Sequence, residues 1–242
     1  MDPSRPPLFA FAAVGVRLGH QDVLADITLE IPASGVTAII GPSGAGKSTL
    51  LRLCNRLEVP TEGQVRFDGT DLAAIDPLIL RRQVGMVFQR PSLFPGSVRD
   101  NLEVADPQLD TAAAVRLLER ADLDATLLDR EAATLSGGEA QRACVARCLA
   151  TGPDALLADE PTSALDVTSR LALEQLARQL ASTGVPVVWV SHDLGQVRRI
   201  ADRVIVLERG LLRASGDREA VLDAVEQDLR RSLASEGGDD GK

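Results

Sequence analysis

The sequence lacks any long hydrophobic run. No stretch approaches eighteen uninterrupted apolar residues, so no segment is predicted to span a bilayer as a helix. The N-terminus carries a short apolar patch, but Gly15 and Arg17 interrupt it and no signal-like cleavage pattern follows. The sequence therefore predicts neither a membrane-spanning helix nor a secretory leader.

Cysteine is scarce as well. The chain has three, Cys54, Cys144 and Cys148, an odd number without the spacing of a disulfide framework, which indicates the cytoplasm. Cys144 and Cys148 stand four residues apart, a spacing that can place two metal ligands on one helix face. No third or fourth ligand is evident nearby, so we expect small core residues rather than a metal site.

Positive charge is in deficit. The chain has 26 lysines and arginines against 35 aspartates and glutamates, a net charge of −9. A protein that grips nucleic acid needs a basic surface, and a membrane-surface anchor needs a polybasic segment, so both are disfavoured and no nucleic-acid partner is expected. A small anionic ligand remains possible, because it needs only a local positive site.

Short apolar runs rich in valine and isoleucine recur between helix-like segments. They are VTAII (36–40), VPVVWV (185–190) and RVIVL (203–207), and the leucine- and alanine-rich run ALLA (155–158) is of the same kind. Such runs predict the buried strands of a mostly parallel sheet. Residues 8–31 alternate more loosely and, with residues 63–69, are predicted to form an antiparallel flank. The fold class is therefore α/β.

The middle of the chain is predicted to be helical. Residues 109–123 have helical spacing with Asp110 or Thr111 as the N-cap, a second helix should start after Ser136, and residues 166–183 should form a crossover helix. We therefore expect one domain of residues 1–242. Its core would comprise about 1–90 and 150–225, its helical subdomain about 91–149, and its C-terminal tail 226–242, partly disordered at SEGGDDGK.

Lysine is almost absent: Lys47 and Lys242 are the only two. Gly41, Gly46, Lys47 and Ser48 match the pattern G-x-x-x-x-G-K-[ST] between the run VTAII and a predicted helix, the context of a phosphate-binding loop. Glycines let successive backbone N–H groups face one anion, while Lys47 supplies a compact positive charge that the planar fork of arginine does not reproduce. The alternative, a glycine-rich turn, does not explain the retained lysine.

The run ALLADEP ends a predicted buried strand in two consecutive carboxylates. Asp159 would help Ser48 hold Mg²⁺, and Glu160 would point toward the water that attacks the γ-phosphate of a nucleotide. The alternative is a solvated acidic turn at a strand end. Its combination with the phosphate loop favours the nucleotide site.

Four further motifs follow the phosphate loop. Gln89 lies in GMVFQRP, LSGGE occupies residues 135–139, SALD occupies 163–166, and His192 lies in VWVSHD. With these motifs, nearly the whole chain resembles the ATP-binding-cassette (ABC) ATPases. It is most similar to the compact ATPases of phosphate importers and of the iron-export and metal-tolerance branch. The resemblance implies a P-loop NTPase (RecA-like) core with an antiparallel flank and an inserted α-helical subdomain.

The resemblance also assigns roles to individual residues. Glu160 would be the general base, His192 would hydrogen-bond the γ-phosphate, and Gln89 would complete the catalytic group. Mg²⁺ would be held by Ser48, Gln89 and Asp159. ATP would be bound by Gly41, Ser43, Gly44, Ala45, Gly46, Lys47, Ser48 and Thr49, and from the partner subunit by Ser136, Gly137 and Gly138, with Asp166 linking the two sites.

One position departs from the family. Leu18 occupies the place where an aromatic residue, usually tyrosine, stacks on adenine, and the chain contains no tyrosine. Phosphate binding is unaffected by this change, but recognition of the base is not explained.

The resemblance implies an ATPase subunit that powers a membrane transporter. Its partners would be integral-membrane subunits on separate chains, which would contact residues 89–102, and a second copy of the chain. It would be cytoplasmic, peripheral on the inner face of the cell membrane. The alternative is a non-transport ABC-type ATPase in repair, assembly or regulation. The single cassette, the absence of long coiled coils and the intact Glu160 and His192 favour transport.

Overall fold

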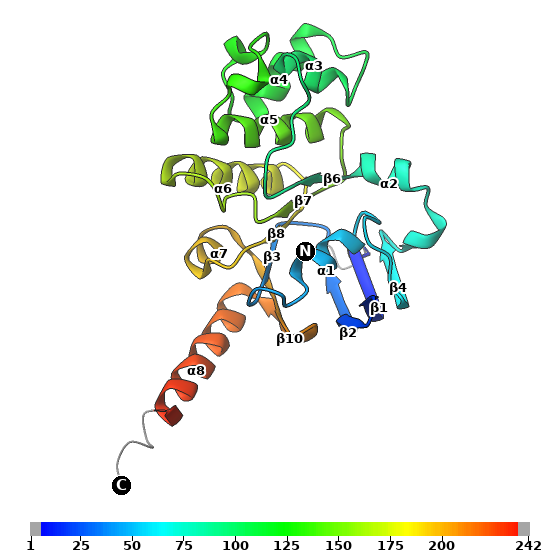
Figure 1. The fold of residues 1–242 in the computed structure, drawn as a ribbon, viewed down its shortest axis with the longest axis vertical. Helices are drawn as coiled ribbons and strands as arrows, with labels where there is room; N and C mark the ends of the chain where they lie inside the picture. Colours follow the sequence, from blue (N-terminus) through cyan, green and yellow to red (C-terminus); the bar gives the residue numbers. More distant parts are fainter. Residues whose placement is uncertain (1–5, 237–242) are drawn as a thin grey trace.

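The computed structural model describes residues 6–236, which form two sheets surrounded by helices (Figure 1). The larger sheet has the strand order β10-β9-β3-β8-β7-β6, and all neighbouring strands are parallel except β10 and β9. Its strands are β3 (Val36–Ile40), β6 (Val84–Val87), β7 (Ala155–Asp159), β8 (Val187–Val190), β9 (Arg203–Glu208) and β10 (Leu211–Asp217). The α/β fold class is thereby confirmed.

The four short apolar runs form β3, β7, β8 and β9, as predicted. Strands β6 and β10 were not predicted. Strand β6 has only four residues and contains Gly85, and β10 alternates between exposed and half-buried residues at the edge of the sheet. Neither has the apolar run from which the other strands were recognised.

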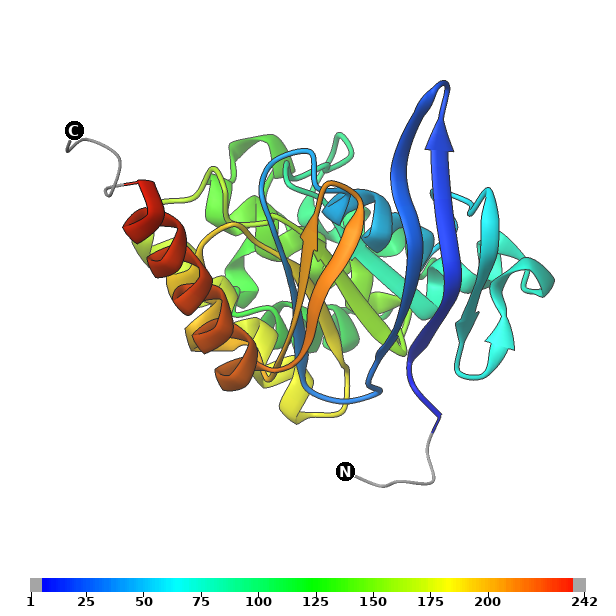
Figure 2. The ribbon, with the colours of Figure 1, turned by 90° about the horizontal axis from the view of Figure 1, so that it is seen from below.

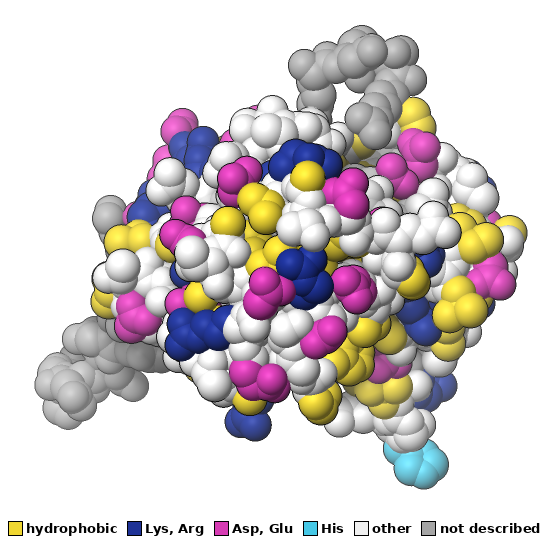
Figure 3. All heavy atoms as spheres, turned by 90° about the horizontal axis from the view of Figure 1, so that it is seen from above, with side chains coloured by type: hydrophobic (Ala, Val, Ile, Leu, Met, Phe, Trp, Pro, Cys, Tyr) yellow, Lys and Arg dark blue, Asp and Glu magenta, His cyan; other side chains and the backbone are white. Residues whose placement is uncertain are grey.

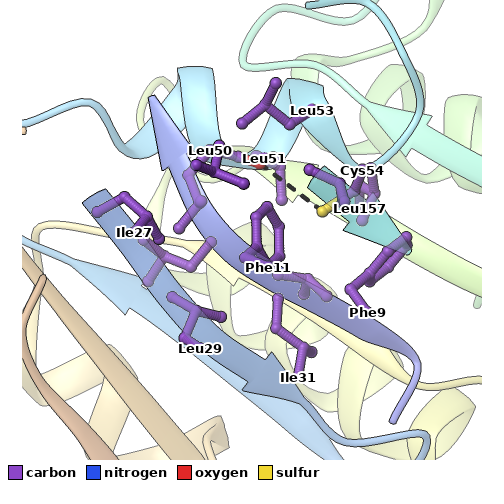
Figure 4. Packing of buried hydrophobic residues seen from close by; sticks show 14 of the residues in the cluster. Phe9, Phe11, Ile27, Leu29, Ile31, Leu50, Leu51, Leu53, Cys54 and Leu157 are labelled. Carbon is purple, nitrogen blue, oxygen red and sulfur yellow. Dashed lines mark hydrogen bonds between the residues drawn. The ribbon is translucent and has the colours of Figure 1, made fainter. Parts of the chain in front are cut away.

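The smaller, antiparallel sheet confirms the predicted flank and has the order β2-β1-β4-β5. Its strands are β1 (Phe9–Leu18), β2 (Gln21–Ile31), β4 (Glu62–Phe67) and β5 (Thr70–Asp71), which run beside one another in Figure 2. Phe11 and Ile27 of this sheet share one buried cluster with Leu50 and Leu51 of helix α1 (Lys47–Leu53), and Phe9 lies on the side of Cys54, so that the apolar face of the flank covers the helix after the phosphate loop (Figure 4).

The helical part of the chain lies at the top of Figure 1. It contains α3 (Val98–Glu103), α4 (Thr111–Arg120) and α5 (Gly137–Ala150), with 3-10 turns at Ala125–Leu127 and Ala132–Thr134. Asp110 caps α4 by accepting the Ala113 N–H, and Ser136 caps α5, as predicted. Leu118 and Leu149 from these helices share one core with Trp189 of β8, which joins the helical part to the larger sheet.

Three further helices border the larger sheet: α6 (Val167–Ser182), α7 (Leu194–Ile200) and α8 (Arg218–Glu236). Helix α2 (Pro77–Gln83) and a 3-10 turn at Leu72–Ala74 connect the two sheets. Asp166 caps the predicted crossover helix, α6. The tail predicted from residue 226 onward begins inside α8, so its first part, to residue 236, is helical. Most of SEGGDDGK lies outside the described residues.

Within residues 6–236, no helix combines the length and the apolarity that crossing a membrane would require.

Candidate active site

The phosphate loop of residues 41–46 leads from β3 into α1, and two of its glycines cannot be replaced without movement. Gly41 has φ 148°, and a Cβ there would lie 2.1 Å from the Leu207 carbonyl oxygen. Gly46, the N-cap of α1, has φ 95°, and a Cβ there would lie 2.6 Å from Leu24 Cδ2 and 2.9 Å from the Val23 carbonyl oxygen. The loop therefore keeps its curvature only with glycine at both positions.

Lys47 places its ammonium group at the inner side of this loop. Its Nζ donates hydrogen bonds to the carbonyl oxygens of Gly41 and Pro42, both at 3.0 Å, and lies 3.8 Å from Glu160 Oε1. Only 7% of the side chain is exposed. A nearly buried cation among carbonyl groups and one carboxylate fits a site for a strongly anionic ligand.

Ser48 and Asp159 lie in contact although 111 residues separate them in the sequence. The Ser48 hydroxyl donates to Asp159 Oδ1 at 2.7 Å, and the Arg52 guanidinium lies 3.4 Å from Asp159 Oδ2. Asp159 is buried at the end of β7. A hydroxyl and a carboxylate at hydrogen-bonding distance are oxygen ligands of the kind that Mg²⁺ takes beside substrate phosphates, so the residues present fit this metal.

Glu160 and His192 form a second contact at the same edge of the sheet. Glu160 Oε2 lies 3.2 Å from His192 Nδ1, and the imidazole is 67% exposed. Glu160 adopts a left-handed backbone conformation, with φ 45°, immediately after β7. A cavity of about 70 Å³ lies beside this pair, lined also by Ser163 and Asp193. The carboxylate thus lies between the Lys47 ammonium and the imidazole.

Gln89 is exposed and lies two residues beyond the carboxyl end of β6, next to the end of β7. In the described part of the chain, no hydrogen bond joins its side chain to Ser48 or Asp159. The segment that carries Gln89 is held instead by Gln141 of α5, whose Nε2 donates to the Phe88 carbonyl oxygen at 2.7 Å. Sequence reasoning missed Gln141.

The residues of the LSGGE motif that are predicted to bind a partner's ATP, called the signature residues below, lie at the N-terminus of α5: Ser136, Gly137 and Gly138. The Ser136 N–H donates to Glu139 Oε2 at 2.8 Å, and the Glu139 N–H donates to the Ser136 hydroxyl at 3.3 Å. The bond from the Ser136 backbone N–H to the carboxylate, with a smaller contribution from the Ser136 side chain, holds the pKa of Glu139 below its usual range. Ser136 and Gly137 are exposed. Gly138 is buried against α6, so closely that a Cβ there would lie 2.3 Å from the Ser169 hydroxyl.

Asp166 lies at the start of α6. Its carboxylate accepts the Ser169 N–H at 3.0 Å, and this bond lowers the pKa of Asp166. In residues 6–236, no hydrogen bond or ion pair joins Asp166 or residues 136–138 to residues 41–49. The structure therefore separates the predicted ATP ligands into two groups.

Leu18, at the end of β1, is 49% exposed. The aromatic residues of the chain all lie elsewhere: Phe9, Phe11, Phe67 and Trp189 are buried, and Phe88 and Phe94 follow β6. The remaining predicted ligands differ in exposure: Ser43 and Gly44 are exposed, Thr49 is half-buried and Ala45 is buried.

Cys144 and Cys148 lie in the packing of α5, as predicted for core residues. The Cys148 thiol donates to the Met86 carbonyl oxygen at 3.4 Å, and burial raises its pKa to about 11. The described residues contain no cluster of three or more histidine, cysteine, aspartate or glutamate side chains arranged to hold a metal ion.

On the face of the molecule shown in Figure 3, lysine and arginine side chains are interspersed with aspartate and glutamate side chains. This face has no continuous basic surface of the kind that binding along nucleic acid requires.

Comparison with known proteins gives consistent matches. The model of the family described as ABC transporter matches residues 24–163. Protein STAR1 of Oryza sativa subsp. japonica is 46% identical over 195 residues, which cover 78% of this chain and 56% of that protein. The phosphate import ATP-binding protein PstB of Leifsonia xyli subsp. xyli is 42% identical over 209 residues, which cover 78% of this chain and 80% of that protein.

Among solved structures, cbiO1 from Clostridium perfringens, part of the ABC transporter complex cbiONQ, has a TM-score of 0.82 at 26% sequence identity. The match covers 94% of both chains.

Proposed function

Because this chain belongs to the ABC transporter family, we propose that it binds and hydrolyses ATP to power a membrane transporter whose transmembrane segments lie on separate chains. The observation that carries the proposal is the position of Glu160, whose carboxylate lies between Lys47 and His192 beside the Ser48–Asp159 pair. In this proposal the arrangement would combine an anion site, a set of metal ligands and a base at one edge of the sheet.

In this proposal the glycines of the loop present backbone N–H groups to the phosphates, and Lys47 balances their charge. Ser48 and Asp159, with Gln89, would hold Mg²⁺, which stabilises charge on the phosphates during transfer. Glu160 would accept a proton from the attacking water. His192, in contact with Glu160, would orient that carboxylate and hydrogen-bond the γ-phosphate.

The exposed signature residues would bind the ATP held by a second copy of the chain. Ser136 and Gly137 offer a hydroxyl and a helix N-terminus to an anion but lack contact with their own phosphate loop. A head-to-tail dimer would join each signature to the partner's loop, with Asp166 between the two sites. Two copies would then enclose two ATP molecules.

The membrane subunits would contact the segment of residues 89–102. Phe94 in this segment is exposed, and the Arg147 guanidinium lies 5.0 Å from its ring centroid. Phe88, Leu78 and Ile79 are further exposed apolar residues on and next to β6 and α2. We propose that the protein works in the cytoplasm, against the inner face of the cell membrane.

The names of the relatives favour transport over repair, assembly or regulation. The chain spans only 56% of the rice protein, and the name of the Leifsonia protein refers to phosphate import. The proposal therefore concerns ATP hydrolysis coupled to transport and assigns no cargo.

The test is Mg²⁺-dependent phosphate release from ATP by the wild type, by Glu160→Gln, and by Glu30→Gln as an exposed control on β2. Loss of the base should lower kcat by about 10²–10⁴-fold, and the control should keep the wild-type rate. Glu160→Gln should still bind ATP and accumulate as a dimer in light scattering. A Glu160→Gln protein with the wild-type kcat would contradict the proposed mechanism.

A further inference from the structure

A single buried amide connects three elements behind the candidate site. Gln196, in the first turn of α7, is 1% exposed. Its Oε1 accepts the indole N–H of Trp189 at 3.0 Å, and its Nε2 donates to Thr162 Oγ1 and to Glu174 Oε1, both at 3.0 Å.

The chemistry of its neighbours fixes the orientation of this amide. An indole N–H can only donate and an ionised carboxylate can only accept, so the amide oxygen must face Trp189 and the nitrogen must face Glu174. Both hydrogens of the nitrogen are then used, one on Glu174 and one on Thr162. A rotated amide would place its oxygen against a carboxylate, so Gln196 has one stable orientation.

Glu174 anchors this amide electrostatically. It comes from α6, which lies beside α7 in Figure 1, and its buried carboxylate receives two hydrogen bonds from Arg199, at 2.7 and 2.9 Å. These bonds raise the pKa of the Arg199 guanidinium. The buried charge is therefore paired, and the Gln196 amide rests on a fixed acceptor.

The two N–H groups of the amide have different roles. One donates to Glu174, and the other donates to Thr162 in the turn that carries Glu160. Thr162 is two residues beyond Glu160, in a turn closed by the hydrogen bond from the Ser163 N–H to the Glu160 carbonyl oxygen at 3.2 Å. Because Glu160 has a left-handed backbone, it relies on this turn to keep its position.

The same residue also determines where the His192 turn lies. The Gln196 N–H donates to Asp193 Oδ1 at 3.1 Å, and the Asp193 N–H donates to the Ser191 hydroxyl at 3.0 Å. Trp189, which binds the amide oxygen, is in β8, directly ahead of this turn. The side chain of Gln196 thus holds the Glu160 turn while its backbone holds the His192 turn.

We propose that Gln196 is a positioning residue for ATP hydrolysis, which sets the separation of the Glu160 carboxylate and the His192 imidazole by holding the Glu160 turn with its side-chain amide and the His192 turn with its backbone N–H. The proposal rests on the proposed function. Gln196 touches neither the phosphate loop nor the Ser48–Asp159 pair, so it acts on the chemical step and not on nucleotide binding. A displacement of about 1 Å between reacting groups is enough to slow an enzyme strongly.

The first test compares Gln196→Met with Gln175→Met, an exposed glutamine on α6. Methionine keeps the length of the side chain but removes the amide. We expect Gln196→Met to lower kcat about five- to tenfold while the dissociation constant of ATP stays at its wild-type value. Gln175→Met should change neither. A merely structural role would lower the unfolding temperature and leave kcat per ATP-binding site unchanged.

The second test separates the hydrogen bond to Thr162 from the hydrogen bond to Trp189. It does not require that Gln196→Met folds. Thr162→Val removes the acceptor near Glu160 and leaves the Trp189 bond intact, so it should lower kcat without moving the emission of Trp189, the only tryptophan in the chain. Thr162→Ser keeps the hydroxyl and should restore most of the rate. Gln196→Met removes the bond to the indole and should shift the emission.

The outcomes distinguish the two proposals. If the wild type shows no Mg²⁺-dependent turnover, the proposed function fails. If the wild type turns over ATP and Gln196→Met and Thr162→Val both keep its kcat, only the positioning role is overturned. A fall in kcat with unchanged ATP binding in Thr162→Val, restored by Thr162→Ser, supports it.

Discussion

The phosphate-loop face and the signature end of α5 differ in how complete they are within one chain. At the loop, Lys47, Glu160 and His192 come from three separate segments and already lie within 3.8 Å of a neighbour. At the signature, Ser136 and Glu139 satisfy each other by reciprocal hydrogen bonds, and Ser136 is exposed.

This difference has a physical cause. The loop face is assembled at the carboxyl ends of β3, β7 and β8, adjacent strands of one buried sheet, so the fold itself fixes the distances between its groups. The signature residues lie at the N-terminus of α5, where the reciprocal cap of Ser136 and Glu139 and the packing of Gly138 against Ser169 of α6 hold them. One chain therefore brings the residues of the phosphate-loop face together, and in the proposed dimer the exposed signature residues would complete the site of a second copy.

The largest effect is expected at the phosphate-loop face, from Lys47→Arg. The substitution keeps the charge but replaces a compact ammonium by a planar group that cannot bind the Gly41 and Pro42 carbonyl oxygens in the same geometry. We expect turnover to fall about 10²-fold, as when one donor that stabilises transition-state charge is lost. Phosphate release measures this, and thermal unfolding checks that the fold is intact. Near-wild-type turnover would show that charge alone suffices.

Leu18→Tyr tests whether recognition of the base belongs to the phosphate-loop face. Stacking on an aromatic ring contributes about 1–3 kcal/mol, so the tyrosine should tighten ATP binding roughly five- to one-hundred-fold. In the wild type, GTP should compete well with ATP, because the phosphate contacts do not read the base.

The measurement is the dissociation constants of ATP and GTP for the wild type and for Leu18→Tyr. Leu78→Tyr on α2, at another exposed leucine, is the control. If the wild type already prefers ATP strongly and Leu18→Tyr binds ATP no more tightly, the adenine stacks on another residue.

A mixing experiment tests whether the signature completes the site of a second copy. Lys47→Arg damages only the loop, and Ser136→Arg blocks only the signature. Each protein alone should be nearly inactive, but random pairing in an equal mixture should recover roughly a quarter of the wild-type rate, because half of the dimers contain one intact composite site. No recovery from two folded proteins that do dimerise would contradict the head-to-tail arrangement.

The smallest effect separates capping from nucleotide binding. Ser97 caps α3 with Asp100 in the same reciprocal pattern in which Ser136 caps α5 with Glu139. Ser97→Ala and Ser136→Ala should each lower the free energy of unfolding by about 1 kcal/mol. Only Ser136→Ala should also slow ATP turnover. Denaturant unfolding and phosphate release on both variants measure the two effects, and equal turnover in the two would remove the functional role of Ser136.

Much of the phosphate-loop face was predictable because its residues follow short apolar strands. A run such as ALLA fixes β7, and parallel strands bring their carboxyl ends to one edge, which is why Asp159 meets Ser48 from more than a hundred residues away. The signature helix was equally predictable from its local capping pattern. Both predictions rest on short motifs whose residues are neighbours in the sequence.

The amide network of Gln196 was not predictable in this way. Its bonds to Thr162 and Glu174 join side chains whose distance depends on how α6 and α7 pack against each other. The available indication was weak: Glu174 sits next to Leu173 on a helix whose neighbouring apolar residues are buried, an unusual place for a carboxylate. Likewise, the position of Gln89 depends on a segment without regular structure, whose path no local pattern specifies.

The left-handed backbone of Glu160 has a consequence for protein engineering. A non-glycine residue in this conformation costs about 1–2 kcal/mol, more than the roughly 0.5–1 kcal/mol of chain entropy that a glycine would cost. A library selected for heat resistance alone would therefore enrich glycine at position 160 and discard the carboxylate. Selection for stability without selection for turnover would, at this one position, yield a more stable protein that lacks the proposed general base.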